Sequence, residues 1–178
     1  MHARLLLLLN TMIDKFNFLL VTLFGIGKLP KIPGSYASLA TIIFLFVLFH
    51  LINISVDIFL FILIFLFIIS IFSINSFVKE TDNKDPKEIV IDEFIGQSIP
   101  ISLYELAHQE TSTKLEIITF YFIMFILFRI FDITKPYPAN YYDKNIKNGF
   151  GVIMDDVVAG LYVVAIMVLF MVVKSSFF

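Results

Sequence analysis

The stretch from Phe128 to Gly160 holds the densest group of chemically capable side chains in this sequence. It reads FRIFDITKPYPANYYDKNIKNGFGVIMDDVVAG and lies between two strongly apolar segments. Its ionisable residues are Arg129, Asp132, Lys135, Asp143, Lys144, Lys147, Asp155 and Asp156. Carboxylates can hold a hard cation, and Arg and Lys can hold phosphate oxygens, so this mixture suits a metal-assisted phosphate site.

A second group consists of the adjacent carboxylates Asp92 and Glu93, inside the apolar segment Ile89 to Tyr104. Ionisable groups at membrane depth are costly, which favours a functional role over simple solvation at the interface. Asp92 and Gly96 are four residues apart and share one helical face, where a glycine lets another element approach closely.

A third group is the segment Gly25 to Ser38, GIGKLPKIPGSYAS. Its glycines and its position before an apolar run are typical of a phosphate-binding loop, with Lys28 or Lys31 adding charge. The alternative is an ordinary interfacial turn with snorkelling lysines. The spacing does not match the Walker P-loop, in which Gly-Lys is followed by Ser or Thr.

The acidic pairs near the apolar runs also have structural interpretations. Arg129 and Asp132 are three apart and could form an intrahelical ion pair. Asp155 or Asp156, behind a turn predicted at 149–151, could cap the following helix. One aspartate is enough for a cap, so the second is unexplained, and Gly160 four residues after Asp156 offers a second close-approach face.

Several chemistries are excluded or disfavoured by composition. The chain has no Cys, which removes thiolate nucleophiles and disulfides. His2, His50 and His108 are scattered, so zinc is not expected, whereas an all-oxygen ligand set suits Mg²⁺. The net charge of −2 gives no indication of nucleic-acid binding. Glu105, Glu110 and Glu116 are expected to be solvated loop charges.

The elements that carry these residues are predicted to be membrane helices. The chain is 59% hydrophobic and 16% charged, with mean hydropathy +0.93, against about 45–50% and about 25% in soluble domains. The apolar residues form blocks near spanning length: Ala37 to Ile54, Val56 to Val78, Leu115 to Phe131 and Val157 to Val173. We therefore predict one domain, 1–178, that is an all-α polytopic membrane protein with four to five membrane-embedded helices. The N-terminal run Leu5 to Leu9 is expected to be a retained interfacial or buried helix.

The positive charges predict which ends of these helices share a side. Basic residues flank the apolar runs: Lys28, Lys31, Lys79, Lys84, Lys87, Arg129, Lys135, Lys144 and Lys147. The positive-inside tendency places all of them in the cytoplasm, provided that Ile89 to Tyr104 crosses or nearly crosses and takes Glu105 to Lys114 to the far side. Pro100 makes that segment a marginal span or a broken helix. On this topology all three polar groups meet on the cytoplasmic face.

The motifs GIGKLPKIPGSYASL, IDEFIG, FRIFDITKPYP and GFGVIMDDVVAG, in this order, resemble the phosphatidylglycerophosphatase A family of bacterial integral membrane phosphatases. The resemblance extends from Gly25 to Gly160. The family usually has Thr and Gly in place of Tyr36 and Ala37, and often Trp in place of Ile91. These departures leave the charged residues intact and affect loop shape and lipid contacts.

The resemblance implies Mg²⁺-dependent hydrolysis of phosphatidylglycerophosphate to phosphatidylglycerol and phosphate, in phospholipid biosynthesis at the bacterial inner membrane. It implies membrane lipids and the lipid substrate as partners, with the oligomeric state open. The family residues carried over are Asp92, Glu93, Arg129, Asp132, Lys135, Asp155 and Asp156.

These residues are assigned roles as a hypothesis. The metal ligands are Asp92, Asp155 and Asp156, with Asp132 as a further ligand and part of the catalytic set. Glu93 is the candidate general base, and Arg129 and Lys135 bind the phosphate oxygens. The remaining substrate-binding candidates are Lys28, Lys31, Gly34, Ser35 and Ser38.

Two other functions stay open at this point. A phosphatidyltransferase acting on CDP-linked lipids also uses aspartates and Mg²⁺, but its spaced Asp-Gly and Ala-Arg motif is missing. A small ion transporter would need charged residues at mid-depth and on both faces, whereas here they cluster toward one face.

Overall fold

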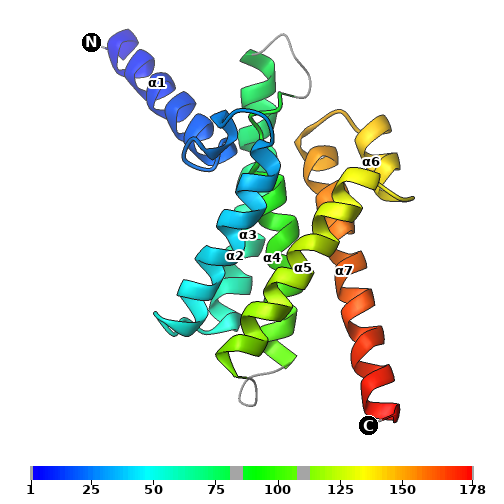
Figure 1. Cartoon of the computed structure of the whole chain (residues 1–178). Helices are drawn as coiled ribbons and strands as arrows, with labels where there is room; N and C mark the ends of the chain where they lie inside the picture. The colour runs from blue at the N-terminus through cyan, green and yellow to red at the C-terminus, as the bar shows by residue number, and fades with distance from the viewer. Residues whose placement is uncertain (1, 81–85, 108–112, 178) are drawn as a thin grey trace.

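The computed structural model describes residues 2–80, 86–107 and 113–177, and this part of the chain consists of helices joined by short turns and loops, without a strand (Figure 1). The elements in order are α1 (His2–Val21), the 3₁₀ helix η1 (Ile26–Lys28), α2 (Pro33–His50), α3 (Val56–Glu80), α4 (Ile91–Ala107), α5 (Lys114–Thr134), α6 (Ala139–Asn145) and α7 (Gly149–Phe177). The predicted all-α fold is confirmed.

Within the described residues, four helices are long and apolar enough to cross a membrane: α2, α3, α5 and α7. Much of their surface is apolar and faces outward; Phe61 of α3 is 76% exposed and Leu115 of α5 is 75% exposed. Such large exposed side chains are unfavourable in water but find an apolar environment among lipid tails. The chain is therefore a polytopic membrane protein, as predicted.

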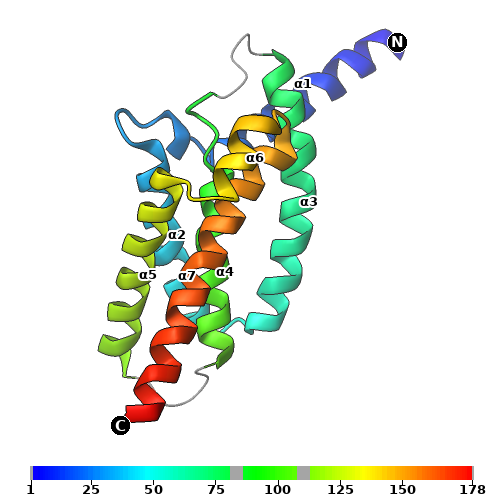
Figure 2. The same cartoon turned by 90° about the vertical axis from the view of Figure 1, so that its right-hand side faces the viewer.

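Helix α4 occupies the centre of the bundle and packs against α2, α3, α5 and α7 (Figure 2). It remains one continuous helix although Pro100 lies inside it, so the alternative of a broken helix is wrong. At 1.5 Å per residue its 17 residues extend about 25 Å, which is close to the thickness of the bilayer core. It runs from the end of the bundle near α6 to the opposite end, as the predicted topology requires (Figure 1).

Two glycines allow α4 and α7 to cross at very short range. A Cβ atom on Gly160 would lie 2.4 Å from the Gly96 carbonyl oxygen, and one on Gly96 would lie 2.5 Å from the Asp156 carbonyl oxygen. Any larger residue at either position would push the backbones apart. Because Asp92 precedes Gly96, and Asp156 precedes Gly160, by about one helical turn, this crossing brings the two aspartates together.

At the end of the bundle opposite α6, the expectation that Glu105 is a solvated loop charge is wrong. Glu105 is not a solvated loop charge, because its Oε1 lies 3.2 Å from His50 Nε2 and accepts a hydrogen bond from Tyr121 OH at 2.9 Å. Glu116 forms a capping box with Thr113 at the start of α5. Glu110 and His108 lie outside the described residues.

Helix α1 leaves the bundle at the end where α6 lies and projects sideways (Figure 1). It contacts α3, and Met12, Ile13 and Phe16 are each more than half exposed. Its chain end is fixed to the start of α4 by a hydrogen bond from Val90 N to Val21 O of 3.0 Å. The predicted helix in the N-terminal apolar segment is confirmed.

Candidate active site

Three carboxylates come together where α4 and α7 cross. Asp92 and Glu93 lie in the first turn of α4, and Asp156 lies in the second turn of α7. Each offers one oxygen, and these oxygens lie within 4.8 Å of one another. Asp156 is buried, and the other two are half-buried. Like charges this close repel strongly unless a cation or a proton compensates them.

Arg129 supplies one of the cations at this group. Its Nη1 lies 2.5 Å from Asp132 Oδ2 and 3.8 Å from Glu93 Oε1, and it donates to Ser38 Oγ at 3.5 Å. The ion pair predicted within one helix is present, but the same guanidinium also joins α5 to α4 and to α2. Asp132 in turn lies beside Asp156 and so links Arg129 to the three-carboxylate group.

Lys135 supplies the second cation, from just beyond the end of α5. The chain leaves the helix there, as the following prolines predicted, and Lys135 adopts a left-handed conformation with φ 42°. Its Nζ donates to Asp143 Oδ1 at 2.7 Å and to Asp155 Oδ2 at 2.6 Å. Burial alone lowers the pKa of Lys135, but these two hydrogen bonds outweigh it and raise the pKa above its ordinary value. The ammonium therefore stays charged at any working pH.

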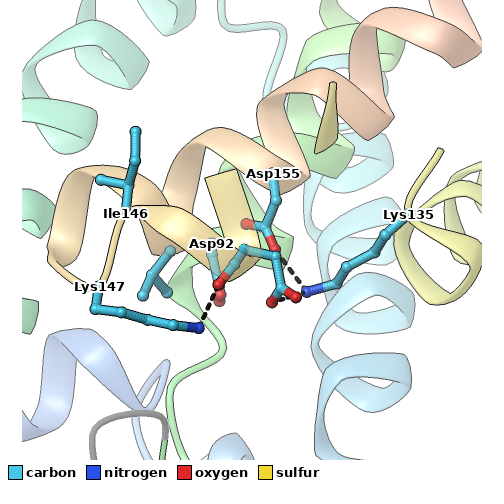
Figure 3. A pocket seen from close by; sticks show the side chains of 7 residues that line it. Asp92, Lys135, Ile146, Lys147 and Asp155 are labelled. Atoms are coloured by element: carbon cyan, nitrogen blue, oxygen red, sulfur yellow. Dashed lines mark hydrogen bonds and ion pairs between the residues drawn. The ribbon is translucent and has the colours of Figure 1, made fainter. Parts of the chain in front are cut away.

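A small polar cavity lies between Lys135 and Asp92 (Figure 3). Its volume is about 50 Å³, enough for a few waters or part of a phosphate. The lining residues are Asp92, Lys135, Asp143, Ile146, Lys147, Val152 and Asp155. Asp92 belongs both to this cavity and to the three-carboxylate group, so the two form one continuous site.

Asp143 and Lys147 are functional candidates that the sequence analysis did not select. Lys147 donates to the Asp143 backbone carbonyl, and Asp143 shares Lys135 with Asp155. The available signal was their spacing of four residues within the charged stretch, which is the spacing of neighbours on a helix, although Lys147 lies beyond the end of α6. That signal is also typical of a solvated surface pair.

The carboxylates named as metal ligands separate into two kinds of environment. Asp92 and Asp156 lie in the three-carboxylate group, which Glu93 joins. Asp155 instead faces Lys135, and Asp132 faces Arg129. The capping interpretation of the second aspartate pair is wrong, because α7 begins six residues earlier, at Gly149, and includes the turn predicted at 149–151. Asn148 caps that helix by accepting a hydrogen bond from Gly151 N at 3.1 Å.

The Gly25 to Ser38 segment reaches the site at its second half. A Cβ atom on Gly34 would lie 1.9 Å from Glu93 Oε1 and 3.2 Å from Arg129 Nη1, so this glycine touches the acidic group directly. Ser38 is buried beside Arg129, and Ser35 is half-buried in the same turn. Lys28 and Lys31 are exposed, and the Lys28 ammonium lies 4.5 Å from the Phe18 ring centroid.

The acidic group fits a divalent cation. Among the described side chains, Glu93 Oε2 and Asp156 Oδ2 are buried without a hydrogen-bond partner. Buried unpaired carboxylate oxygens are costly, and a metal ion would satisfy them. All three ligands are oxygens, which are the donors that Mg²⁺ prefers.

Comparison with known proteins identifies the family. The family model described as Phosphatidylglycerophosphatase A matches residues 19–171. The chain belongs to the phosphatidylglycerophosphatase A family. The predicted relationship is therefore confirmed, as is the prediction that the protein is a phosphatase.

Two individual relatives of this phosphatidylglycerophosphatase A family member carry the family's name, and a third carries a different description. The chain is 33% identical over 149 residues to phosphatidylglycerophosphatase A of Haemophilus influenzae, covering 83% of this chain and 84% of that protein. It is 30% identical over 143 residues to phosphatidylglycerophosphatase A of Escherichia coli, covering 80% and 76%. A Bacteroides thetaiotaomicron protein with a provisional description as a phosphatidylinositol-3-phosphatase is 32% identical over 149 residues, covering 81% and 86%. No solved structure shows a significant match.

Proposed function

We propose that this protein is a Mg²⁺-dependent phosphatase that hydrolyses the terminal phosphomonoester of phosphatidylglycerophosphate to phosphatidylglycerol and phosphate. The observation that carries the proposal is the meeting of three carboxylates, two of them with unpaired buried oxygens, beside Arg129 and Lys135. Carboxylates for a metal ion next to cations for phosphate are the parts that phosphoryl transfer needs. The family relatives supply the substrate class.

Asp92 and Asp156 are the residues proposed to hold Mg²⁺, with Asp132 and Asp155 in the surrounding shell. Mg²⁺ usually binds one or two carboxylates and keeps several waters, which matches these two aspartates, of which Asp92 also lines the small polar cavity. When bound, the ion supplies charge neutralisation at the phosphate oxygens. The side chains of this chain then perform the remaining tasks.

Arg129 and Lys135 are proposed to hold the phosphate oxygens from two sides. Lys135 is oriented by Asp143 and Asp155, and Arg129 by Asp132, so both cations are preorganised before substrate arrives. Glu93 is proposed to take the proton from the attacking water, because its Oε2 is unpaired beside the acidic group. The water oxygen forms the new bond to phosphorus and the P–O bond to glycerol breaks. The leaving glycerol oxygen takes a proton from solvent and becomes a hydroxyl, and Glu93 then releases the proton that it accepted to solvent.

The site is proposed to face the cytoplasm, at the bacterial inner membrane. The end of the bundle that carries the site holds η1, the ends of α3 and α5, and α6 (Figure 1). These elements and the turns beside them carry Lys28, Lys31, Lys79, Lys135, Lys144 and Lys147. The positive-inside tendency assigns such an end to the cytoplasm. The described ionisable groups of the site lie at this end rather than at mid-depth, which favours a lipid phosphatase over an ion transporter.

The test is phosphate release from phosphatidylglycerophosphate in mixed micelles, with Mg²⁺ and with EDTA. Wild type should release phosphate only with Mg²⁺, and Asp156→Asn should lose at least about 100-fold in rate. Asp57→Asn, an exposed aspartate at the opposite end of α3, is the matched control and should keep wild-type activity.

Two results would contradict the proposal. If folded wild type released no phosphate with any divalent metal, the proposed hydrolysis of phosphatidylglycerophosphate would be wrong. If Asp156→Asn kept full activity, the assignment of Asp156 as a metal ligand would be wrong. A parallel assay uses phosphatidylinositol 3-phosphate, the substrate class in the Bacteroides relative's description. Faster phosphate release from phosphatidylinositol 3-phosphate would indicate that this lipid is the preferred substrate.

A further inference from the structure

A large apolar cavity lies on the other side of α4 from the carboxylates. Its volume is about 420 Å³, within the range of about 300–1,000 Å³ typical of ligand pockets. The end of α1, η1, α2, α3 and α4 form its walls, through residues that include Leu20, Phe24, Ala40, Phe44, Ile91 and Phe94. Thr41 is the polar residue in the lining, and its hydroxyl donates to the Ala37 carbonyl. The cavity therefore suits a hydrocarbon.

The first turn of α4 faces both the cavity and the active site. Ile91 and Phe94 line the cavity, whereas Asp92 and Glu93 between them belong to the acidic group. Residues three apart lie on one face of a helix, and the two between them point to the other side. An α-helix with its side chains is about 10–12 Å across, so a molecule filling both places must have an apolar part and a reactive part about that far apart.

The stretch from Ile26 in η1 to Gly34 in α2 connects the two places along the chain. Ile26 lines the cavity, and Gly34 touches Glu93. Between them lie Lys28 and Lys31, both exposed. The segment thus leads from an apolar cavity, past two positive charges, to the phosphate site.

The cavity is built from firmly joined elements. A Cβ atom on Gly27 would lie 2.0 Å from the Glu88 carbonyl oxygen, which shows how closely η1 packs on the chain before α4. The Val90 N to Val21 O hydrogen bond joins α1 to the same stretch. The rings of Phe44 and Phe94, with centroids 5.9 Å apart, form part of the wall.

We infer that this cavity holds an acyl chain of the lipid substrate while the terminal phosphate lies at the carboxylates. This inference rests on the proposed function, and it adds where the lipid tail binds. In phosphatidylglycerophosphate a phosphodiester and two glycerol units separate the acyl chains from the terminal phosphate, so the headgroup has the length to pass around the first turn of α4. The internal phosphodiester carries a negative charge that Lys28 and Lys31 match.

The experiment fills the cavity and varies the acyl chain. Ala40→Phe places a ring in the cavity, and Ala40→Leu makes a smaller addition in case the larger one impairs folding. Ala165→Phe, at an exposed position on α7, is the matched control for an added ring on a lipid-facing helix. Each variant is assayed on dioleoyl and on dihexanoyl phosphatidylglycerophosphate, with its thermal midpoint and its mass in detergent recorded.

Ala40→Phe should lower kcat/KM on the dioleoyl lipid by about tenfold or more, since contacts with the non-reacting tail position the headgroup. Its kcat/KM on the dihexanoyl lipid, whose chains are too short to fill the cavity, should stay within about twofold of wild type. Ala40→Leu should show the same selectivity with a smaller loss, and Ala165→Phe should change neither substrate.

An equal loss on both lipids, or no loss on the dioleoyl lipid in either Ala40 variant, would overturn the acyl-chain assignment while leaving the phosphatase intact. A change in the mass of the assembly with unchanged chain-length dependence would also overturn it, by showing that the cavity is covered by a second copy. If wild type were inactive on both lipids, the proposed function would be wrong, and the acyl-chain inference would fail with it.

Discussion

Replacing Gly34 with alanine is the sharpest test of the active-site geometry. The new Cβ atom would lie 1.9 Å from Glu93 Oε1 and 2.9 Å from Glu93 Cδ. Ordinary contact begins at 3.4 Å, so the carboxylate must move by about 1.5 Å. The atom that meets the new methyl group belongs to the end of a flexible side chain, so the helix itself need not shift.

A displacement of this size should affect catalysis far more than stability. Misplacing a catalytic group by about 1 Å can lower the rate about 100-fold, which corresponds to about 2.7 kcal/mol of transition-state stabilisation. The helix itself gains, because alanine is a better helix former than glycine. We therefore expect Gly34→Ala to lose about 100-fold or more in kcat with a thermal midpoint near that of wild type.

The assay measures phosphate release and thermal unfolding on the same preparations. Gly25→Ala is the control, because a Cβ atom there meets nothing within 4 Å, although φ of +95° makes it unfavourable for alanine by about 1–2 kcal/mol. That variant should lose stability and keep its activity. Gly34→Ala with activity within threefold of wild type would refute the reasoning, because Glu93 would then not need this position.

Three further predictions follow from other contacts. Lys135→Met should lower kcat/KM about 10²–10³-fold, because Asp155 loses its cation and the phosphate loses a donor; activity near wild type would exclude a role in phosphate binding. Gly160→Ala should reduce the thermal midpoint and the activity together, since its Cβ atom would meet the rigid Gly96 carbonyl at 2.4 Å; an unchanged midpoint would contradict the close crossing. Glu105→Ala should lower the free energy of unfolding by about 1–3 kcal/mol, because His50 and Tyr121 lose their acceptor. Its kcat should be unchanged, because these residues lie at the end of the bundle opposite the active site; loss of kcat without loss of stability would contradict this.

The close crossing of α4 and α7 shows how far local sequence patterns can lead. In two segments the sequence places an aspartate one helical turn before a glycine: Asp92 before Gly96, and Asp156 before Gly160. Each pair predicted a helical face on which another element could approach closely. The structure joins these two patterns into one crossing. The spacing predicted the faces because helical periodicity is a local property, but it could not predict that each face would meet the other.

Glu105 shows where the sequence was misleading. Its position near the end of a helix is typical of a solvated charge, and its partners His50 and Tyr121 come from α2 and α5. Only the packing of three helices places these side chains together. Lys135 is similar: its charge suggested phosphate binding, but its two carboxylate partners depend on how the chain folds back through α6.

The sequence by itself determined the membrane helices, the order of the motifs and their position at one end of the bundle. Length, apolarity and the placement of charge are properties of each segment alone, so they can be predicted without knowing the neighbours. The tertiary structure decided which carboxylates meet, which are held by Arg129 or Lys135, and where an apolar cavity opens beside α4. The physical reason is that these helices are apolar on nearly all sides, because lipid and protein interior favour the same side chains. Their sequences therefore do not show which face turns inward, and helix rotation and crossing fix the site.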